Sequence, residues 1–268
     1  MKRDALESGP VRCSGNTRRR WILFLISTFH FSLFTLSGCR VPAPLITLPP
    51  VAYADAAEAA ALLSARRDAV QTVQTQATLR FTPAGKKPQT LDAQLVYAAP
   101  DRARLRAGKL NHNVFDLTVT PEGVWTAVSP RVTDRAPDAE AGLVRLAEVL
   151  PFLLSGPDYA DADVAATQKK DRLNLIWKHG LGVELDAATL TPLRFALTDP
   201  QRPDRAPVVI KPVYTVYDAA GRGVPWLHSA AASGGFGRVE LTFYDVVLND
   251  DLNPRAFRPP RRATAHPR

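Results

Sequence analysis

The chain has 268 residues, of which 46% are hydrophobic, and it carries a formal net charge of +8 at pH 7. The first 38 residues hold six basic and two acidic side chains, so half of that excess lies there and +4 remains on the rest. The remaining Lys and Arg are interleaved with acids rather than gathered into a stripe, which argues against a nucleic-acid-binding class. The two cysteines, Cys13 and Cys39, leave residues 40–268 without a disulfide or a cysteine metal site.

Residues 1–38 have the three parts of an export signal. Basic residues, among them Arg18–Arg20, precede an uncharged stretch from Trp21 to Gly38 that is rich in Leu, Ile and Phe. The motif LSGC, Leu36–Cys39, ends this stretch and resembles the lipobox of bacterial lipoproteins. The resemblance implies cleavage after Gly38 and a membrane anchor on Cys39, made of a diacylglyceryl group and a further acyl chain such as palmitate. Two or more acyl chains hold a protein firmly in a bilayer.

Two alternatives stay open for this segment. The uncharged stretch of 18 residues just reaches the length of a spanning helix, so an uncleaved anchor competes with the cleaved signal. Thr17–Trp21 is also similar to a twin-arginine signal, which leaves the export route open between Sec and Tat. Arg40 stands where inner-membrane lipoproteins of proteobacteria carry a retaining Asp. We therefore expect the outer membrane, with the folded domain facing the periplasm.

Residues 39–54 contain four prolines and predict an extended tether between the lipid and the domain. Asp55 then precedes an Ala-rich segment with Glu58 early and Arg66-Arg67 late, the charge order that a helix dipole favours. We therefore predict a helix over residues 55–70. A second helix is predicted over residues 138–155, where leucines recur at helical spacing and a proline should kink the helix or end its first part.

From residue 75 the hydrophobic period changes from 3.6 to 2, which predicts antiparallel strands with one wet face. In residues 102–108 the arginines alternate with Ala and Leu, and in residues 114–119 Asp116 and Thr118 oppose the apolar side chains. Further strands are expected at residues 90–97, 172–179, 182–188, 192–199, 207–218 and 238–249. A count of about ten strands and two helices predicts a mainly β (α+β) domain. Residues 261–268 are expected to form a basic, disordered tail.

Four segments resemble those of a known family. They are a strand with a Pro-Asp-Arg turn at Val96–Gly108, a hairpin at Thr120–Val128, a strand entry at Gly221–Ala230 and a Phe-x-Pro-Pro ending within Tyr244–Pro260. In this order, over residues 55–260, they resemble the lipoprotein-localisation proteins: LolA, a soluble carrier, and LolB, a lipid-anchored receptor. The resemblance implies a curved, unclosed antiparallel β half-barrel, with an N-terminal helix and a central helix covering its concave face.

The resemblance also implies a hydrophobic cavity that binds acyl chains or lipoproteins between the sheet and the central helix. The expected wall residues are Leu79, Phe81, Leu95, Tyr97, Leu105, Phe115, Leu117, Trp125, Trp177 and Phe195. The expected residues of the covering helix are Leu146, Val149, Leu150, Phe152 and Leu153. Alternating apolar side chains are equally typical of a filled core, so both interpretations of these residues stay open.

The sequence motifs favour no catalytic or metal-binding alternative. The histidines after residue 40 stand singly, without HExxH, and the segment SGGFG at residues 233–237 lacks the lysine of a phosphate-binding loop. Asp158, Asp161 and Asp163 lack the spacing of a calcium loop. We therefore predict a protein without enzymatic activity, cofactor or metal.

The function that we expect from the sequence is that of a monomeric, LolB-like acceptor or carrier in outer-membrane lipoprotein localisation. Its expected partners are the membrane, acyl chains or lipoproteins as cargo, and a periplasmic carrier protein. Two alternatives remain: a sensor or assembly-factor lipoprotein of the same fold that binds a protein partner, and a structural lipoprotein with a filled core.

Overall fold

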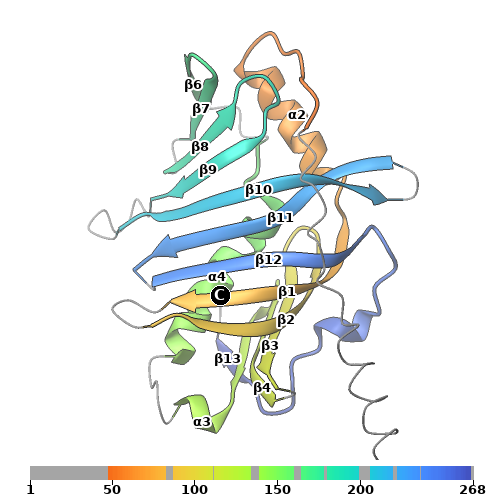
Figure 1. Ribbon diagram of the computed structural model, residues 1–268, viewed down its shortest axis with the longest axis vertical. Coiled ribbons are helices and arrows are strands. Elements are labelled where there is room, and N and C mark those ends of the chain that lie inside the picture. Colours follow the sequence, from red (N-terminus) through yellow and green to blue (C-terminus); the bar gives the residue numbers. More distant parts are fainter. Residues whose placement is uncertain are drawn as a thin grey trace, which may run out of the picture. The chain divides into compact units, whose positions relative to one another are not determined.

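All strands of the described residues lie in one antiparallel sheet of thirteen strands (Figure 1). The computed structural model describes residues 48–82, 87–110, 112–133, 139–159, 164–177, 180–198, 206–219, 222–235 and 237–266. The predictions for the export signal, for Cys39 and for the tether up to residue 47 lie outside these residues. The described residues belong to one compact unit, Leu45–Arg268.

Two meanders make up the sheet. The first comprises β1 (Thr72–Thr82), β2 (Gln89–Ala98), β3 (Arg102–Lys109), β4 (His112–Thr120) and β5 (Gly123–Val128). The second comprises β6 (Val164–Lys169), β7 (Arg172–Trp177), β8 (Leu181–Asp186), β9 (Pro192–Leu197), β10 (Val208–Ala219), β11 (Arg222–Gly234) and β12 (Gly237–Leu248). A last short strand, β13 (Thr264–His266), follows near the C-terminus.

The strand order is β13-β5-β4-β3-β2-β1-β12-β11-β10-β9-β8-β7-β6. The two meanders therefore join through β1 and β12, which pair antiparallel from Val73 opposite Leu248 to Thr82 opposite Arg238. The first and last strands of this order, β13 and β6, do not pair with each other, so the sheet is unclosed. The predicted fold class, a curved and unclosed antiparallel sheet with helices, is confirmed.

The N-terminal helix, α2 (Ala56–Asp68), begins where the sequence predicts it. The Asp55 side chain accepts a hydrogen bond of 2.9 Å from the Glu58 backbone N–H, and the Glu58 carboxylate accepts one of 2.5 Å from the Ala54 N–H. These bonds satisfy backbone donors that a helix start leaves free. The described end of the predicted tether is already part of the domain, because Leu48 is buried and the Val51 N–H donates to the Ala188 carbonyl.

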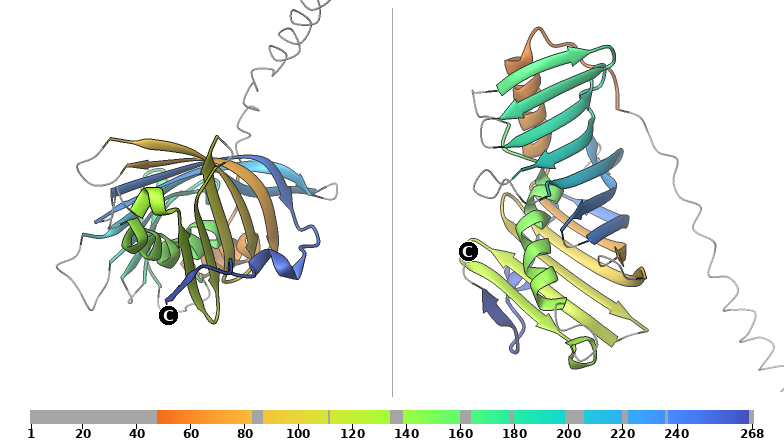
Figure 2. Two further views of the ribbon diagram at one scale, coloured as in Figure 1. Left: turned by 90° about the horizontal axis from the view of Figure 1, so that it is seen from below. Right: turned by 90° about the vertical axis from the view of Figure 1, so that its left-hand side faces the viewer.

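The central helix, α4 (Ala139–Ser155), follows a short helical turn, α3 (Pro130–Thr133), and continues through Pro151 rather than ending there. Proline removes one backbone N–H donor from the helix. The apolar face of α4 on both sides of Pro151 is buried against the sheet, and this packing holds the last turn in place. Figure 2 shows α4 along the concave side of β1–β5, and α2 beside the strands β6–β9 at the other end of the sheet.

Asn249 ties the end of β12 to the corner between α2 and β1. Its side-chain amide donates to the Ala69 carbonyl at 2.7 Å and accepts from the Gln71 N–H at 2.8 Å. Its φ of 58° lies in the left-handed region, which Asn tolerates better than most residues. Asn249, which lies in the segment Tyr244–Pro260 of the family resemblance, therefore has a structural role.

The C-terminal segment crosses the outer face of the first meander, and this differs from our expectation. The sequence predicts a wet outer face on β3 and β4, yet Asp116 is 2% and Thr118 0% exposed. Arg104 holds the Asp116 carboxylate with two hydrogen bonds of 2.9 and 2.7 Å, and it also donates to the carbonyl of Ala256 in η1 (Pro254–Phe257) at 2.9 Å. The segment around η1 thus covers residues that a local pattern assigns to solvent.

Residues 264–266 also differ from the expected tail, because they form β13 and pair with β5, Thr264 opposite Thr126. The edge of β5 offers free backbone groups, and pairing satisfies them. The His266 Nε2 lies 3.0 Å from the Thr126 Oγ1. The C-terminal segment therefore adds an edge strand beside β5 instead of extending away from the sheet.

Candidate functional site

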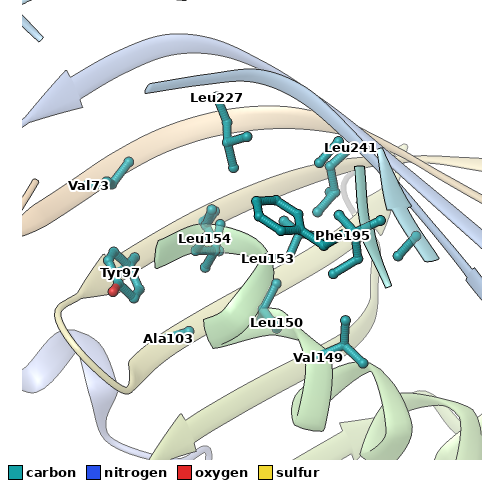
Figure 3. Packing of buried hydrophobic residues seen from close by; sticks show 14 of the residues in the cluster. Val73, Tyr97, Ala103, Val149, Leu150, Leu153, Leu154, Phe195, Leu227 and Leu241 are labelled. Atoms are coloured by element: carbon teal, nitrogen blue, oxygen red, sulfur yellow. The ribbon is translucent and has the colours of Figure 1, made fainter. Parts of the chain in front are cut away.

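The concave face of the sheet meets the apolar face of α4 in one continuous cluster (Figure 3). Most of the predicted cavity residues belong to it as buried side chains: Leu79, Leu95, Tyr97, Leu105, Phe115, Leu117, Leu146, Val149, Leu150, Leu153, Trp177 and Phe195. Phe81 and Phe152 are partly buried and pack against this cluster. The rings of Phe152 and Phe195 meet edge to face at 5.5 Å. The structure therefore brings the predicted wall and the predicted cover into direct contact.

Trp125 is the predicted wall residue that the structure does not bring to this cluster. Its neighbour Val124 is a buried core residue of β5, and successive side chains of a strand point to opposite faces. Trp125 is partly exposed on the other face, opposite Ala265 of β13. Burial does not alternate cleanly along residues 123–128, because the consecutive residues Gly123 and Val124 are both buried, as is Thr126. A period of 2 therefore does not assign the face of Trp125.

Polar contacts attach α4 to the sheet at its two ends. At the first turn the Thr126 hydroxyl donates to the Glu140 carboxylate at 2.9 Å, and this hydrogen bond lowers the pKa of Glu140. At the last turn the Ser155 side chain lies close to Tyr97: burial raises the pKa of Tyr97, and Ser155 partly offsets this rise. Between these ends the inner face of α4 is apolar. Apolar packing has no direction, so other apolar groups can replace this part of the contact.

A partly open cavity of about 50 Å³ lies where α2, the end of α4 and the strands β10 and β11 converge. Its apolar and aromatic lining is formed by Leu48, Leu63, Val70, Tyr97, Leu154, Tyr159, Pro192, Tyr214, Pro225 and Trp226. Arg66, Arg67 and Ser155 complete the lining. This volume holds a few water molecules or one small polar group, since one water needs about 10–15 Å³ on the same measure. An acyl chain does not fit there.

A larger, open groove of about 330 Å³ runs along the outer side of α2. Its lining is Val51, Leu62, Ala65, Arg66, Ala69, Gly223, Val224 and Pro225. Arg66 and Pro225 line both spaces, so the groove and the cavity are neighbours. The groove has the volume and the apolar character of common small-molecule sites.

The two arginines of α2 have different surroundings. Arg67 pairs with the carboxylates of Asp68 and Asp158 at 2.9 and 3.0 Å. Arg66 donates to the carbonyls of Thr189 and Leu190 at 2.7 and 3.2 Å, and no carboxylate of the described residues lies within ion-pair distance of it. Burial lowers the pKa of Arg66, because the charged form loses solvation.

Three aromatic residues, Tyr159, Tyr214 and Trp226, line the same cavity. Burial raises the pKa of Tyr159 well above its ordinary value, and the Tyr214 pKa is raised by burial of its hydroxyl end although the side chain as a whole is partly exposed. The nearby charge of Arg66 partly offsets the shift of Tyr214. Trp226 is 2% exposed, and its indole N–H has no hydrogen-bond partner among the described residues.

Sequence reasoning missed this cavity. Arg66 was interpreted only as a charge that complements the helix dipole, and a pair of arginines late in a helix satisfies that interpretation whatever lies beneath it. Tyr159, Tyr214 and Trp226 come from separate segments that only the fold brings together. Among the predicted wall residues, Tyr97 lines this cavity.

The described residues contain no group of three or more His, Cys, Asp or Glu side chains that could hold a metal ion. No helix within the described ranges is long and apolar enough to cross a membrane.

The fold defines a class of unclosed antiparallel half-barrels whose concave face is covered by helices, the architecture that the resemblance to LolA and LolB implied. No protein-family model and no curated protein sequence matches the chain. Among solved structures, it is similar to a DUF1329 family protein from Desulfovibrio piger, with 13% identity over 76% of this chain and 98% of that chain and a TM-score of 0.50. At this identity the similarity shows a shared fold and no more.

Two further similar structures have TM-scores below 0.5. One is a LolA superfamily protein from Nitrosomonas europaea, with 9% identity over 74% of this chain and 97% of that chain and a TM-score of 0.45. The other is a putative outer membrane lipoprotein-sorting protein domain from Vibrio parahaemolyticus, with 14% identity over 76% and 97% of the two chains and a TM-score of 0.47.

Proposed function

We propose that this protein is a lipid-anchored lipoprotein of the periplasmic side of the outer membrane that binds acyl chains or lipoproteins under α4, as a LolB-like acceptor or carrier. The observation that carries the proposal is the contact between α4 and the sheet, which is apolar between two polar ends. An acyl chain that replaces the inner face of α4 meets the same apolar wall. Displacing α4 therefore exposes a hollow without leaving buried polar groups unpaired along its length.

Transfer by such a protein requires a graded series of affinities and no catalytic group. The acceptor must bind the chains more tightly than the donor and less tightly than the bilayer, and about 1.4 kcal/mol gives a tenfold bias. In the present structure the side chains of α4 fill the hollow, as in Figure 3. We interpret this arrangement, in which α4 packs on the sheet, as the closed state of the carrier.

A second observation favours a role at a membrane. Leu110, at the turn between β3 and β4, is 82% exposed and has a φ of 50°, so the turn holds a large apolar side chain out in solvent. Lys109 precedes it in β3. An apolar side chain next to a cation suits the surface of an anionic bilayer, where the first enters the interface and the second meets the head groups.

Expression of residues 45–268 in a bacterial periplasm, followed by native mass spectrometry and lipid extraction, tests the proposal. We expect co-purified acyl lipid or lipoprotein, released when the protein unfolds. A stable, monomeric and empty protein that also fails to bind a fluorescent fatty acid would contradict it. That outcome would leave the two alternatives: a sensor or assembly-factor lipoprotein that binds a protein partner, and a structural lipoprotein with a filled core.

A further inference from the structure

No carboxylate of the described residues lies within ion-pair distance of Arg66. The next residue on the same helix, Arg67, has two carboxylate partners, whereas Arg66 has two backbone carbonyls and borders two empty spaces. Backbone carbonyls satisfy two donors and leave the rest of the guanidinium fork available. A partly buried cation without a counter-charge favours a bound anion.

Two hydroxyl groups line the cavity beside Arg66. They belong to Tyr159 and Tyr214, and among the described residues these hydroxyls make no hydrogen bond. Buried polar groups in proteins are nearly always paired. One oxygen-rich anion in the 50 Å³ cavity supplies acceptors for the guanidinium and for these donors together.

The outer groove is apolar and shares Arg66 and Pro225 with the cavity. Apart from Arg66, the described residues that line it are apolar or glycine, among them Leu62, Val224 and Pro225. Since Arg66 and Pro225 line both spaces, a ligand that touches Arg66 can place its charged end in the cavity and its chain in the groove. A ligand with one charged end and one apolar chain is a single-chain anionic amphiphile.

We propose that the cavity and groove beside α2 form a binding site for a single-chain anionic amphiphile, whose carboxylate or phosphate lies between Arg66, Tyr159 and Tyr214 and whose acyl chain lies along α2. The site is separate from the face under α4. It rests on the proposed function only in that its ligand carries an acyl chain.

Calorimetric titration of residues 45–268 tests this site, with laurate as the anionic amphiphile, 1-dodecanol as the uncharged chain and acetate as the anion alone. The whole described core lies within this compact unit, and a cooperative thermal transition is the check on each variant. We expect the protein to bind laurate at least tenfold more tightly than dodecanol. Arg66→Gln removes this preference, whereas the matched control Arg80→Gln, at an exposed position of β1, retains it.

Four other outcomes are possible in this experiment, and the first three overturn part or all of the proposed site. Equal affinity for laurate and dodecanol, or an unchanged preference in Arg66→Gln, overturns the anion site and leaves the face under α4 untouched. Binding of acetate as tightly as laurate replaces the amphiphile with a free anion and overturns the role of the groove. Binding of neither chain overturns this site and the proposed function together. If Arg66→Gln does not fold, Tyr214→Phe takes its place, with laurate affinity expected to fall several-fold and dodecanol affinity unchanged.

Discussion

Replacing Leu150 by alanine should make the protein less stable and, at the same time, a better binder of acyl chains. Leu150 is 0% exposed on the inner face of α4. Removing a buried leucine side chain costs about 3 kcal/mol or more, from lost transfer free energy and from the cavity left behind. The Leu150 side chain makes these contacts only while α4 lies on the sheet. In the alanine variant, the free energy that opposes displacement of α4 is therefore smaller by about the same amount.

The expected gain in affinity follows from that figure. A ligand that binds only the open state has an apparent affinity reduced by the fraction of open molecules, and about 3 kcal/mol less opposition raises this fraction up to about a hundredfold. The assay is titration with a fluorescent fatty acid, alongside urea denaturation. Leu185→Ala is the matched control, because Leu185 is also 0% exposed but lies in β8, near α2. Equal stability loss in both variants without tighter binding by Leu150→Ala would refute the reasoning.

Three further predictions concern single residues. Asp116→Asn leaves the buried guanidinium of Arg104 uncompensated and should lower the free energy of unfolding in urea by about 3–5 kcal/mol. Arg106→Gln, at a side chain 52% exposed, should lower it by less than about 1 kcal/mol. Equal effects of the two substitutions would contradict the importance of the buried pair. Asn249→Ala should cost about 2 kcal/mol in the same assay, from two hydrogen bonds of about 1 kcal/mol each, and Asn249→Gly should cost less because glycine tolerates the positive φ; the reverse order would contradict this explanation. Leu110→Ser should weaken binding to anionic vesicles about tenfold in a sedimentation assay, because the turn loses its apolar contact, and unchanged binding would remove this turn from the membrane contact.

Local sequence signals predicted the elements that local physics determines. Asp55 and Glu58 mark the start of α2 because capping is a matter of four neighbouring residues. The strands β2, β3 and β4 follow from a period of 2 over six or more residues, and the unclosed half-barrel follows from the family resemblance. Each of these signals lies within one segment of the chain.

The elements that the sequence did not indicate depend on partners far away. β13 has three residues, and its partner β5 lies about 140 positions earlier, so no local pattern identifies it. β6 is exposed along its described side chains and shows no alternation. The outer face of β3 and β4 was expected to be wet because Arg104 and Asp116 are charged, yet Ala256 lies against them in the folded chain.

The candidate functional site also has a part that the sequence predicted and a part that it did not. The residues of the concave face were predictable because a strand exposes one face to the core. The face of Trp125 was not, since burial does not alternate at the start of β5, where Gly123 and Val124 are both buried. The cavity at Arg66 was not predictable, because a sequence does not show that no carboxylate of the described residues lies close to this arginine. That feature appears only when Arg67 and its two carboxylates are placed beside it.

Photo-crosslinking with a diazirine-bearing fatty acid tests the central claim, that acyl chains bind under α4, most directly. The labelled peptides of residues 45–268 are mapped by mass spectrometry. The proposed function predicts labels on the inner face of α4, at and around Leu150, and on the facing strands at Leu95, Leu105 and Leu117. Labels confined to the groove beside α2, or labels that a hundredfold excess of unlabelled fatty acid does not compete away, would contradict it.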